Sequence, residues 1–128
     1  MTGNATPAGS RSKAELLRLI QAQRDDYRRT LPEKMAQMET LWHEARQAGP
    51  VSAPFAATER LAHNLHGTAG TYGFRDLSHA SRTLELALRS LMDAGAQLDP
   101  DEEQRITEAI AAVRLSLPTD PPSGSGAP

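Results

Sequence analysis

The stretch TLPEKMAQMETLWHEA, residues 30–45, decides the class of fold. It opens as Thr-Leu-Pro-Glu, a capping-box pattern typical of helix starts, with Pro32 in the first turn, where its missing N–H costs little. Apolar residues then recur every three or four positions, which is the period of one helical face. These residues are Leu31, Met35, Met38, Trp42 and Ala45. The stretch therefore predicts a helix with one buried side.

The same signals recur on both sides of this stretch and predict four more helices. Their expected starts are Ser12 (in the box Ser-Lys-Ala-Glu), Ser52, Asp76 and Asp99, with turn signals at Gly49-Pro50 and Gly95. The apolar stripes include Leu16, Leu17, Ile20 and Tyr27 in the first helix, Leu77, Ala80, Leu84, Leu88 and Leu91 after Asp76, and Ile106, Ala109, Ile110 and Val113 in the last. Amphipathic helices joined by short turns predict an all-α fold, an antiparallel four-helix bundle with an additional N-terminal helix.

Composition supports a helical fold and excludes several classes of function. Only 4% of the 128 residues are aromatic, and valine and isoleucine are rare, whereas an all-β domain needs both kinds. The net charge of −2 and the lack of a basic block argue against nucleic-acid binding through phosphate contacts. No apolar run approaches the ~18 residues of a membrane span, and no cysteine is present for a disulfide or a thiolate metal site. We therefore expect a cytoplasmic protein with no nucleic-acid or membrane partner.

The two ends of the chain differ from its centre. Residues 1–11 are mostly small and polar, and residues 117–128 contain the run PTDPPSGSGAP. Such segments bury too little apolar surface to order themselves. We expect one domain over residues 12–116, a flexible N-terminal segment before it, and a disordered tail or interdomain linker after it.

The segment AHNLHGTAGTYGF, residues 62–74, carries most of the functional information. Glycine occupies positions 67, 70 and 73, although each glycine inside a helix costs ~1 kcal/mol relative to alanine. Close packing, or the close approach of another molecule, must offset that cost.

Helical geometry separates the first histidine of this segment from the core. At about 100° per residue, one stripe should face the core. Its members are Leu61, Leu65, Thr68 and Tyr72. His63 lies about 200° from Leu61, whereas Gly67 and Gly70 lie within about 40° of His63. The pattern predicts an exposed imidazole with small residues beside it, and a neutral imidazole has a lone pair for nucleophilic work.

This segment resembles the signature of the histidine phosphotransfer (HPt) domain, written H-x-L-K-G-x-x-x-x-x-G. Four of the five defined positions are filled, by His63, Leu65, Gly67 and Gly73. The leucine pattern that ends at Glu85 also resembles the family, and the likeness extends over residues 12–115.

The resemblance implies a relay of a phosphoryl group in two-component signalling. In that family the histidine accepts the group from a receiver-domain aspartate and returns it to another. His63 would then be the phospho-acceptor through Nε2. Leu65 would lie in the core, Gly67 would allow close approach, and Gly73 would belong to the turn into the next helix. The docking face around His63 would consist of Glu59, Arg60, Asn64, His66, Gly67 and Gly70.

The resemblance also implies partners: a response-regulator receiver domain, a hybrid histidine kinase, or both. The receiver should bring the Mg²⁺ and most of the charge stabilisation, so no cofactor is expected on this chain. Nothing in the sequence resembles an ATP-binding site, so we do not expect a kinase. The oligomeric state is left open.

One position departs from the signature, because His66 stands where the family has lysine. A lysine one turn from the acceptor gives a permanent positive charge beside the phosphoryl group, whereas a histidine gives that charge only when protonated. We therefore expect phosphotransfer that is slower, pH-dependent, or lost in favour of docking alone. In the last case the bundle is a phosphorylation-silent scaffold that binds a receiver or output domain.

The N-terminal part adds a second resemblance. The run from Tyr27 to Met35, Tyr-x-x-Thr-Leu-Pro-Glu-x-Met, followed by Leu41-Trp42, resembles HPt modules that precede receiver and output domains in multidomain response regulators. Together with the linker-like C-terminal tail, it implies the N-terminal domain of such a regulator.

Two other chemistries are alternatives at the same segment. The spacing HxxH places His63 and His66 on one helical face, but a zinc site needs three or four ligands, so His43, His79 or Glu59 would have to join them. The glycines are arranged G-x-x-G-x-x-G, which matches no phosphate-binding loop, and no strand is expected before them. We therefore expect neither a metal site nor a nucleotide site.

Overall fold

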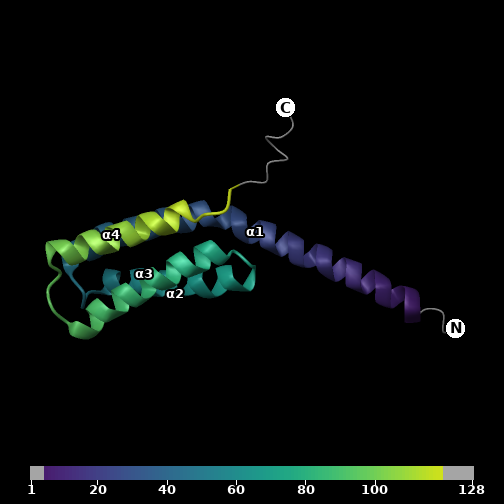
Figure 1. The fold of residues 1–128 in the computed structure, drawn as a ribbon, viewed down its shortest axis with the longest axis horizontal. Helices are drawn as coiled ribbons and strands as arrows, with labels where there is room; N and C mark the ends of the chain where they lie inside the picture. Colours follow the sequence, from purple (N-terminus) through teal and green to yellow (C-terminus); the bar gives the residue numbers. More distant parts are fainter. Residues whose placement is uncertain (1–4, 120–128) are drawn as a thin grey trace, which may run out of the picture. The chain divides into compact units, whose positions relative to one another are not determined.

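The computed structural model describes residues 5–119, with side chains from residue 12 onward. It contains four helices, α1 (Ala5–Ala48), α2 (Ala53–Thr71), α3 (Arg75–Ala94) and α4 (Pro100–Leu115), and the described residues include no strand (Figure 1). The prediction of an all-α helical bundle is confirmed. None of the helices in this described part is long and apolar enough to cross a membrane.

The chain divides into two compact units, one ending at Pro32 and one beginning at Glu33. The first unit contains the N-terminal part of α1. The second contains the rest of α1 together with α2, α3 and α4, and we call it the bundle unit. Within the bundle unit, α2 packs along α3, and α3 also packs against α4 (Figure 1).

The additional N-terminal helix is not a separate element. We predicted a new helix start at Thr30, but α1 runs unbroken through 44 residues with Pro32 inside it. A proline inside a helix removes one backbone hydrogen bond and costs ~3 kcal/mol, yet it does not have to end the helix. Leu31 and Met35, on either side of the proline, are each only 2% exposed. Burial of that face therefore offsets the lost hydrogen bond, which a reading of local signals alone could not weigh.

The first helix also begins earlier than predicted, at Ala5 rather than Ser12. The flexibility of residues 1–11 and of the tail 117–128 stays a prediction. Residues 120–128 of that tail lie outside the described part.

The core of the bundle unit is built from the predicted apolar stripes. Its buried hydrophobic residues are Met35, Met38, Trp42, Ala45, Phe55, Ala62, Leu65, Ala69, Phe74, Leu77, Leu84, Leu88, Ile106, Ile110 and Val113. The rings of Trp42 and Phe55 meet edge to face with centroids 5.9 Å apart, a geometry that aromatic pairs prefer. Trp42 also donates a hydrogen bond from Nε1 to Thr107 Oγ1 of α4 at 3.0 Å. The buried indole is therefore satisfied and fixes α1 against α4.

The helix ends follow the predicted signals closely. Ser52 caps α2 by accepting a hydrogen bond from the Phe55 N–H, and Asp99 and Glu102 form a complete capping box at the start of α4. Helix α3 begins at Arg75, next to the predicted Asp76, and has no side-chain cap. Gly73, in the turn between α2 and α3, has φ +82°, a conformation that side chains with a Cβ rarely adopt. The predicted turn role of Gly73 therefore has a conformational reason.

The buried face of α2 is rotated from the predicted one. Of the four residues expected in the core, only Leu65 is buried, while Leu61, Thr68 and Tyr72 are half-buried. The buried residues of α2 are Phe55, Thr58, Ala62, Leu65 and Ala69. Two of these residues, Ala62 and Ala69, are fully buried alanines, whose small side chains give only a weak hydrophobic signal in the sequence. The predicted direction of the buried face of α2 was therefore wrong, although His63 is exposed as predicted.

Candidate functional site

The candidate site lies on the solvent side of the seam between α2 and α3. His63 of α2 has a side chain that is 58% exposed, and its Nδ1 lies 2.7 Å from Oε2 of Glu85 on α3. The Glu85 side chain is only 2% exposed. An exposed ring is thus anchored at one nitrogen to a buried carboxylate.

This hydrogen bond assigns the tautomer of His63. A carboxylate can only accept, so Nδ1 carries the hydrogen and donates it to Glu85. In the neutral ring the other nitrogen, Nε2, then holds the lone pair. When Nε2 forms a new bond the ring gains positive charge, and the adjacent carboxylate stabilises that charge. The geometry therefore leaves Nε2 of the neutral His63 ring with the free lone pair.

Glu85 is itself held by an arginine of the next turn. Arg89 Nη2 donates to Glu85 Oε2 at 3.0 Å and to Glu59 Oε2 of α2 at 2.8 Å. The hydrogen bond to Glu59, followed by the charge of that carboxylate, raises the pKa of Arg89 above its usual value. Two carboxylates and one guanidinium leave one net negative charge beside the imidazole. The buried carboxylate that accepts from His63 Nδ1 is therefore itself held in place by a cation.

The second oxygen of Glu85 is buried and has no hydrogen-bond partner among the described residues. Leaving a charged oxygen unsatisfied costs free energy, because the group has lost its water and gained nothing at that atom. A helical bundle would be more stable with an apolar residue here, so Glu85 suits its contact with His63 better than it suits the core.

His66, one turn after His63, contacts α3 through a different partner. Its ring is half-buried, with Nδ1 3.0 Å from Ser78 Oγ and 3.2 Å from the Ser78 carbonyl oxygen. The Ser78 hydroxyl donates in turn to the backbone oxygen of His66 at 2.9 Å. His66 is therefore tied to α3 through Ser78, and it makes no ion pair with a carboxylate among the described residues.

The glycines serve different purposes. A Cβ at Gly67 would meet nothing within 4 Å, so this exposed position is open to an approaching molecule. A Cβ at Gly70 would lie 3.2 Å from Ser78 Oγ, which is tighter than most real contacts. Gly70 thus makes room for Ser78, a packing reason in addition to its expected place on the docking face.

The remaining predicted site residues lie where α2 places them. Arg60 and Asn64 are exposed, Leu65 is 3% exposed in the core, and Glu59 is drawn into the ion pair with Arg89. Ser78 and Arg89 were not predicted as site residues, and Glu85 was predicted only as the end of a leucine pattern. These three come from α3, and only the register between the two helices brings Glu85 to His63, Ser78 to His66 and Arg89 to Glu59. The spacing of four between Glu85 and Arg89 was the available signal.

The structure gives no support to a metal centre. The described residues contain no group of three or more His, Cys, Asp and Glu side chains that could hold a metal ion. His43 and His79 are exposed on other elements.

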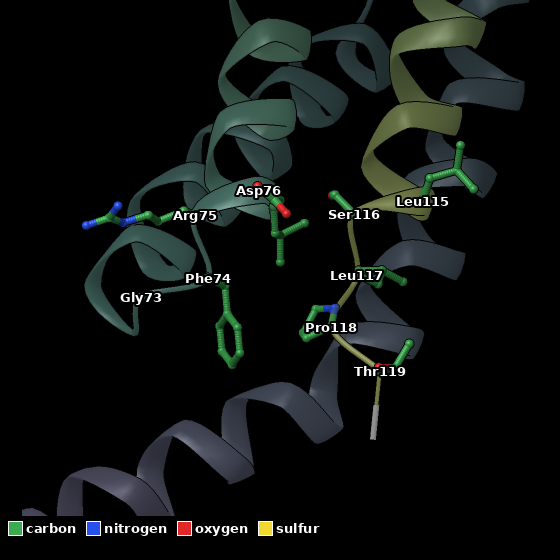
Figure 2. Close-up of a pocket in the computed structure, with 10 residues that line it drawn as sticks. Gly73, Phe74, Arg75, Asp76, Leu115, Ser116, Leu117, Pro118 and Thr119 are labelled. Atoms are coloured by element: carbon green, nitrogen blue, oxygen red, sulfur yellow. The ribbon is translucent and has the colours of Figure 1, made fainter. Parts of the chain in front are cut away.

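A separate hollow lies between the α2–α3 turn and the segment that follows α4 (Figure 2). Its lining includes the apolar residues Phe74, Leu77, Leu117 and Pro118 and the charged residues Arg75 and Asp76. Neither His63 nor Glu85 borders it, so it plays no part in the chemistry of the imidazole.

The model of the Hpt domain family matches residues 24–116, which is most of the chain and includes α2, α3 and α4. No curated protein and no solved structure matches the chain.

Proposed function

Because the chain belongs to the Hpt domain family, we propose that His63 is a phospho-acceptor that relays a phosphoryl group between receiver-domain aspartates. Proteins of this family serve histidine phosphotransfer in phosphorelays and are not kinases. The observation that carries the assignment is the 2.7 Å hydrogen bond from His63 Nδ1 to Glu85. It leaves Nε2 as the lone-pair nitrogen of an exposed ring.

The proposed step is an in-line displacement at phosphorus. Nε2 of neutral His63 forms the new P–N bond while the P–O bond to the receiver aspartate breaks, and the aspartate carboxylate leaves with the electron pair. The Nδ1 hydrogen stays on the ring, so phosphorylated His63 carries an imidazolium charge. Glu85 faces that charge through its hydrogen bond, and the reverse step returns the ring to neutrality.

The receiver is proposed to supply the Mg²⁺, since phosphoryl transfer depends mainly on positioning and on neutralising the phosphoryl oxygens. Arg60, Asn64 and Gly67 are exposed around His63 and form the proposed contact surface. Such a receiver belongs to a response regulator or a hybrid histidine kinase, which puts the encounter in the cytoplasm. The N-terminal position in a multidomain response regulator is part of the same proposal.

One observation favours a second candidate function. His66 stands at the lysine position of the motif, and without that positive charge the bundle would bind a receiver or output domain and transfer nothing. This phosphorylation-silent scaffold shares the docking face and differs only in chemistry.

The deciding experiment is transfer from a panel of phosphorylated receiver domains to the wild type, His63→Gln and the matched control His79→Gln. The relay predicts acid-labile, alkali-stable label on the wild type and on His79→Gln, and none on His63→Gln. Receiver binding without any label would instead support the scaffold, and label that survives in His63→Gln would exclude His63 as acceptor. Circular dichroism checks that all three proteins keep their helices.

A further inference from the structure

The polar stripes of α2 and α3 run antiparallel in a constant register. Glu59 faces Arg89, and His63, four residues later on α2, faces Glu85, four residues earlier on α3. Gly70, seven residues after His63, meets Ser78, seven residues before Glu85. Each step along α2 is thus matched by an equal step back along α3.

This register places Arg82 opposite His66. His66 lies three residues after His63, and Arg82 lies three residues before Glu85. Residues three apart on a helix share a face, with Cβ atoms about 5–6 Å apart. Arg82 therefore lies one turn from the carboxylate that holds His63, on the side toward His66, and its long side chain can reach across that distance.

The Arg82 guanidinium is uncommitted. Its side chain is exposed, and it makes no hydrogen bond or ion pair with any described residue. Arg89, the other cation close to the acceptor on α3, is already shared between two carboxylates. Arg82 can thus offer a full positive charge to an incoming group.

His66 cannot give that charge in its neutral form. The Ser78 carbonyl oxygen only accepts hydrogen bonds, and the Ser78 hydroxyl donates its hydrogen to the His66 backbone oxygen. Nδ1 of His66 must therefore be the donor, so a neutral ring has a bare Nε2. A lone pair at that atom would repel a phosphoryl oxygen. The residue at the lysine position of the motif therefore gives the phosphoryl group no positive charge unless His66 is protonated.

We propose that Arg82 contacts the phosphoryl group on His63 and supplies, from α3, the permanent positive charge that the motif usually supplies from α2. This role rests on the proposed function of His63. A guanidinium can give an anionic phosphoryl group two parallel hydrogen bonds, which a neutral imidazole cannot. The residue is then a catalytic one, since it touches the transferred group.

The test uses phosphoramidate, a small donor that needs no receiver. The P–N bond of the donor breaks, ammonia leaves, and the phosphoryl group bonds to Nε2 of His63. Labelling rates are compared for the wild type, Arg82→Gln, Arg82→Lys and the control Arg105→Gln, which removes one exposed charge from α4. We expect Arg82→Gln to be labelled about tenfold more slowly, the effect of one charge-assisted hydrogen bond. Arg82→Lys keeps the charge but loses the paired hydrogen bonds, so its rate should lie between those of Arg82→Gln and the wild type, and Arg105→Gln should label at the wild-type rate.

A rescue variant separates contact with the phosphoryl group from an indirect effect. Adding His66→Lys to Arg82→Gln returns the cation to the motif position and should restore the wild-type rate. Equal labelling rates in Arg82→Gln and Arg105→Gln, with a labelled wild type, would overturn the role of Arg82 and leave the proposed function of His63 in place. Failure of His66→Lys to rescue would do the same. A wild type that takes no label at His63 would overturn the proposed function, and this role with it.

Discussion

The α1–α4 seam and the α2–α3 seam each contain an arginine–glutamate ion pair, but they differ in the groups that they bury. Between α1 and α4, Trp42 is buried and hydrogen-bonded to Thr107, and the Arg114–Glu39 ion pair lies at the exposed edge. Between α2 and α3, the carboxylate of Glu85 is inside and the imidazole of His63 is outside. Charge on the exposed edge costs little, whereas a buried carboxylate with one unpaired oxygen is costly. The first seam keeps its ion pair at the exposed edge, whereas the second buries a charge beside the proposed phospho-acceptor.

Trp42→Ala should produce the largest change, because it removes the central side chain of the α1–α4 seam. Truncating a buried tryptophan costs about 3–5 kcal/mol, and Trp42 is 4% exposed. Urea unfolding measures the loss. Trp42→Phe keeps most of the side-chain volume but loses the hydrogen bond to Thr107. Its free energy of unfolding should therefore lie between those of the wild type and Trp42→Ala. An unfolding free energy unchanged in Trp42→Ala would contradict the packing described here.

Glu85→Ala, in the α2–α3 seam, should reduce phosphoryl transfer, whereas Trp42→Ala reduces stability. Removing a carboxylate that orients a metal-bound histidine typically lowers activity about 10–100-fold, and we expect a loss of similar size in phosphoryl transfer to His63, which Glu85 orients in the same way. Glu85→Gln keeps an acceptor for Nδ1 and loses only the charge, so its loss should be smaller. Stability should not fall in Glu85→Gln, since the unpaired buried charge is gone. Equal transfer rates in Glu85→Ala and the wild type would remove Glu85 from the mechanism.

Gly67→Ala separates docking from chemistry. A Cβ at this position meets nothing, and alanine is favoured over glycine in a helix by ~1 kcal/mol, so thermal unfolding should occur at a higher temperature. Transfer from a receiver should slow, because the methyl group stands on the proposed contact surface. Labelling by phosphoramidate should not change. If both donors slowed equally, Gly67 would act on the imidazole rather than on docking.

Glu39→Gln tests the exposed pair of the α1–α4 seam and should have the smallest effect. The hydrogen bond from Arg114, with the charge of that arginine, lowers the pKa of Glu39 below its usual value. The pair therefore stabilises the fold above the ordinary pKa of a glutamate, and this contribution disappears as the pH falls through the lowered value. Unfolding at pH 7 should show a slightly less stable variant, and at pH 2 the difference should vanish. A difference that grows on acidification would contradict this assignment.

Much of the bundle follows from periodicity and punctuation in the sequence. The stripe from Met35 to Ala45 and the caps at Ser52 and Asp99 depend on residues close together in the chain, so local rules predict them. The continuity of α1 through Pro32 does not, because it depends on burial of the face that contains Leu31 and Met35. Tertiary packing there outweighs a local stop signal.

The site was predicted in part, for a similar reason. His63 follows from its spacing within α2 and from its resemblance to a family signature, and its ring is exposed as predicted, although the buried face of α2 is rotated from the predicted one. Glu85, Arg89 and Ser78 come from α3, and sequence spacing within one helix says nothing of the register between two. The alanines Ala62 and Ala69 belong to the buried face of α2, and small residues leave a weak hydrophobic signal.

The central claim is that Nε2 of His63 takes the phosphoryl group while Nδ1 keeps its hydrogen for Glu85. Long-range proton–nitrogen NMR of the ¹⁵N-labelled protein, before and after phosphorylation, reads both ring nitrogens directly. We predict a neutral His63 ring protonated at Nδ1 before the reaction, and a phosphorus coupling at Nε2 after it. A ring protonated at Nε2 in the free protein, or a phosphoryl group on Nδ1, would contradict the account.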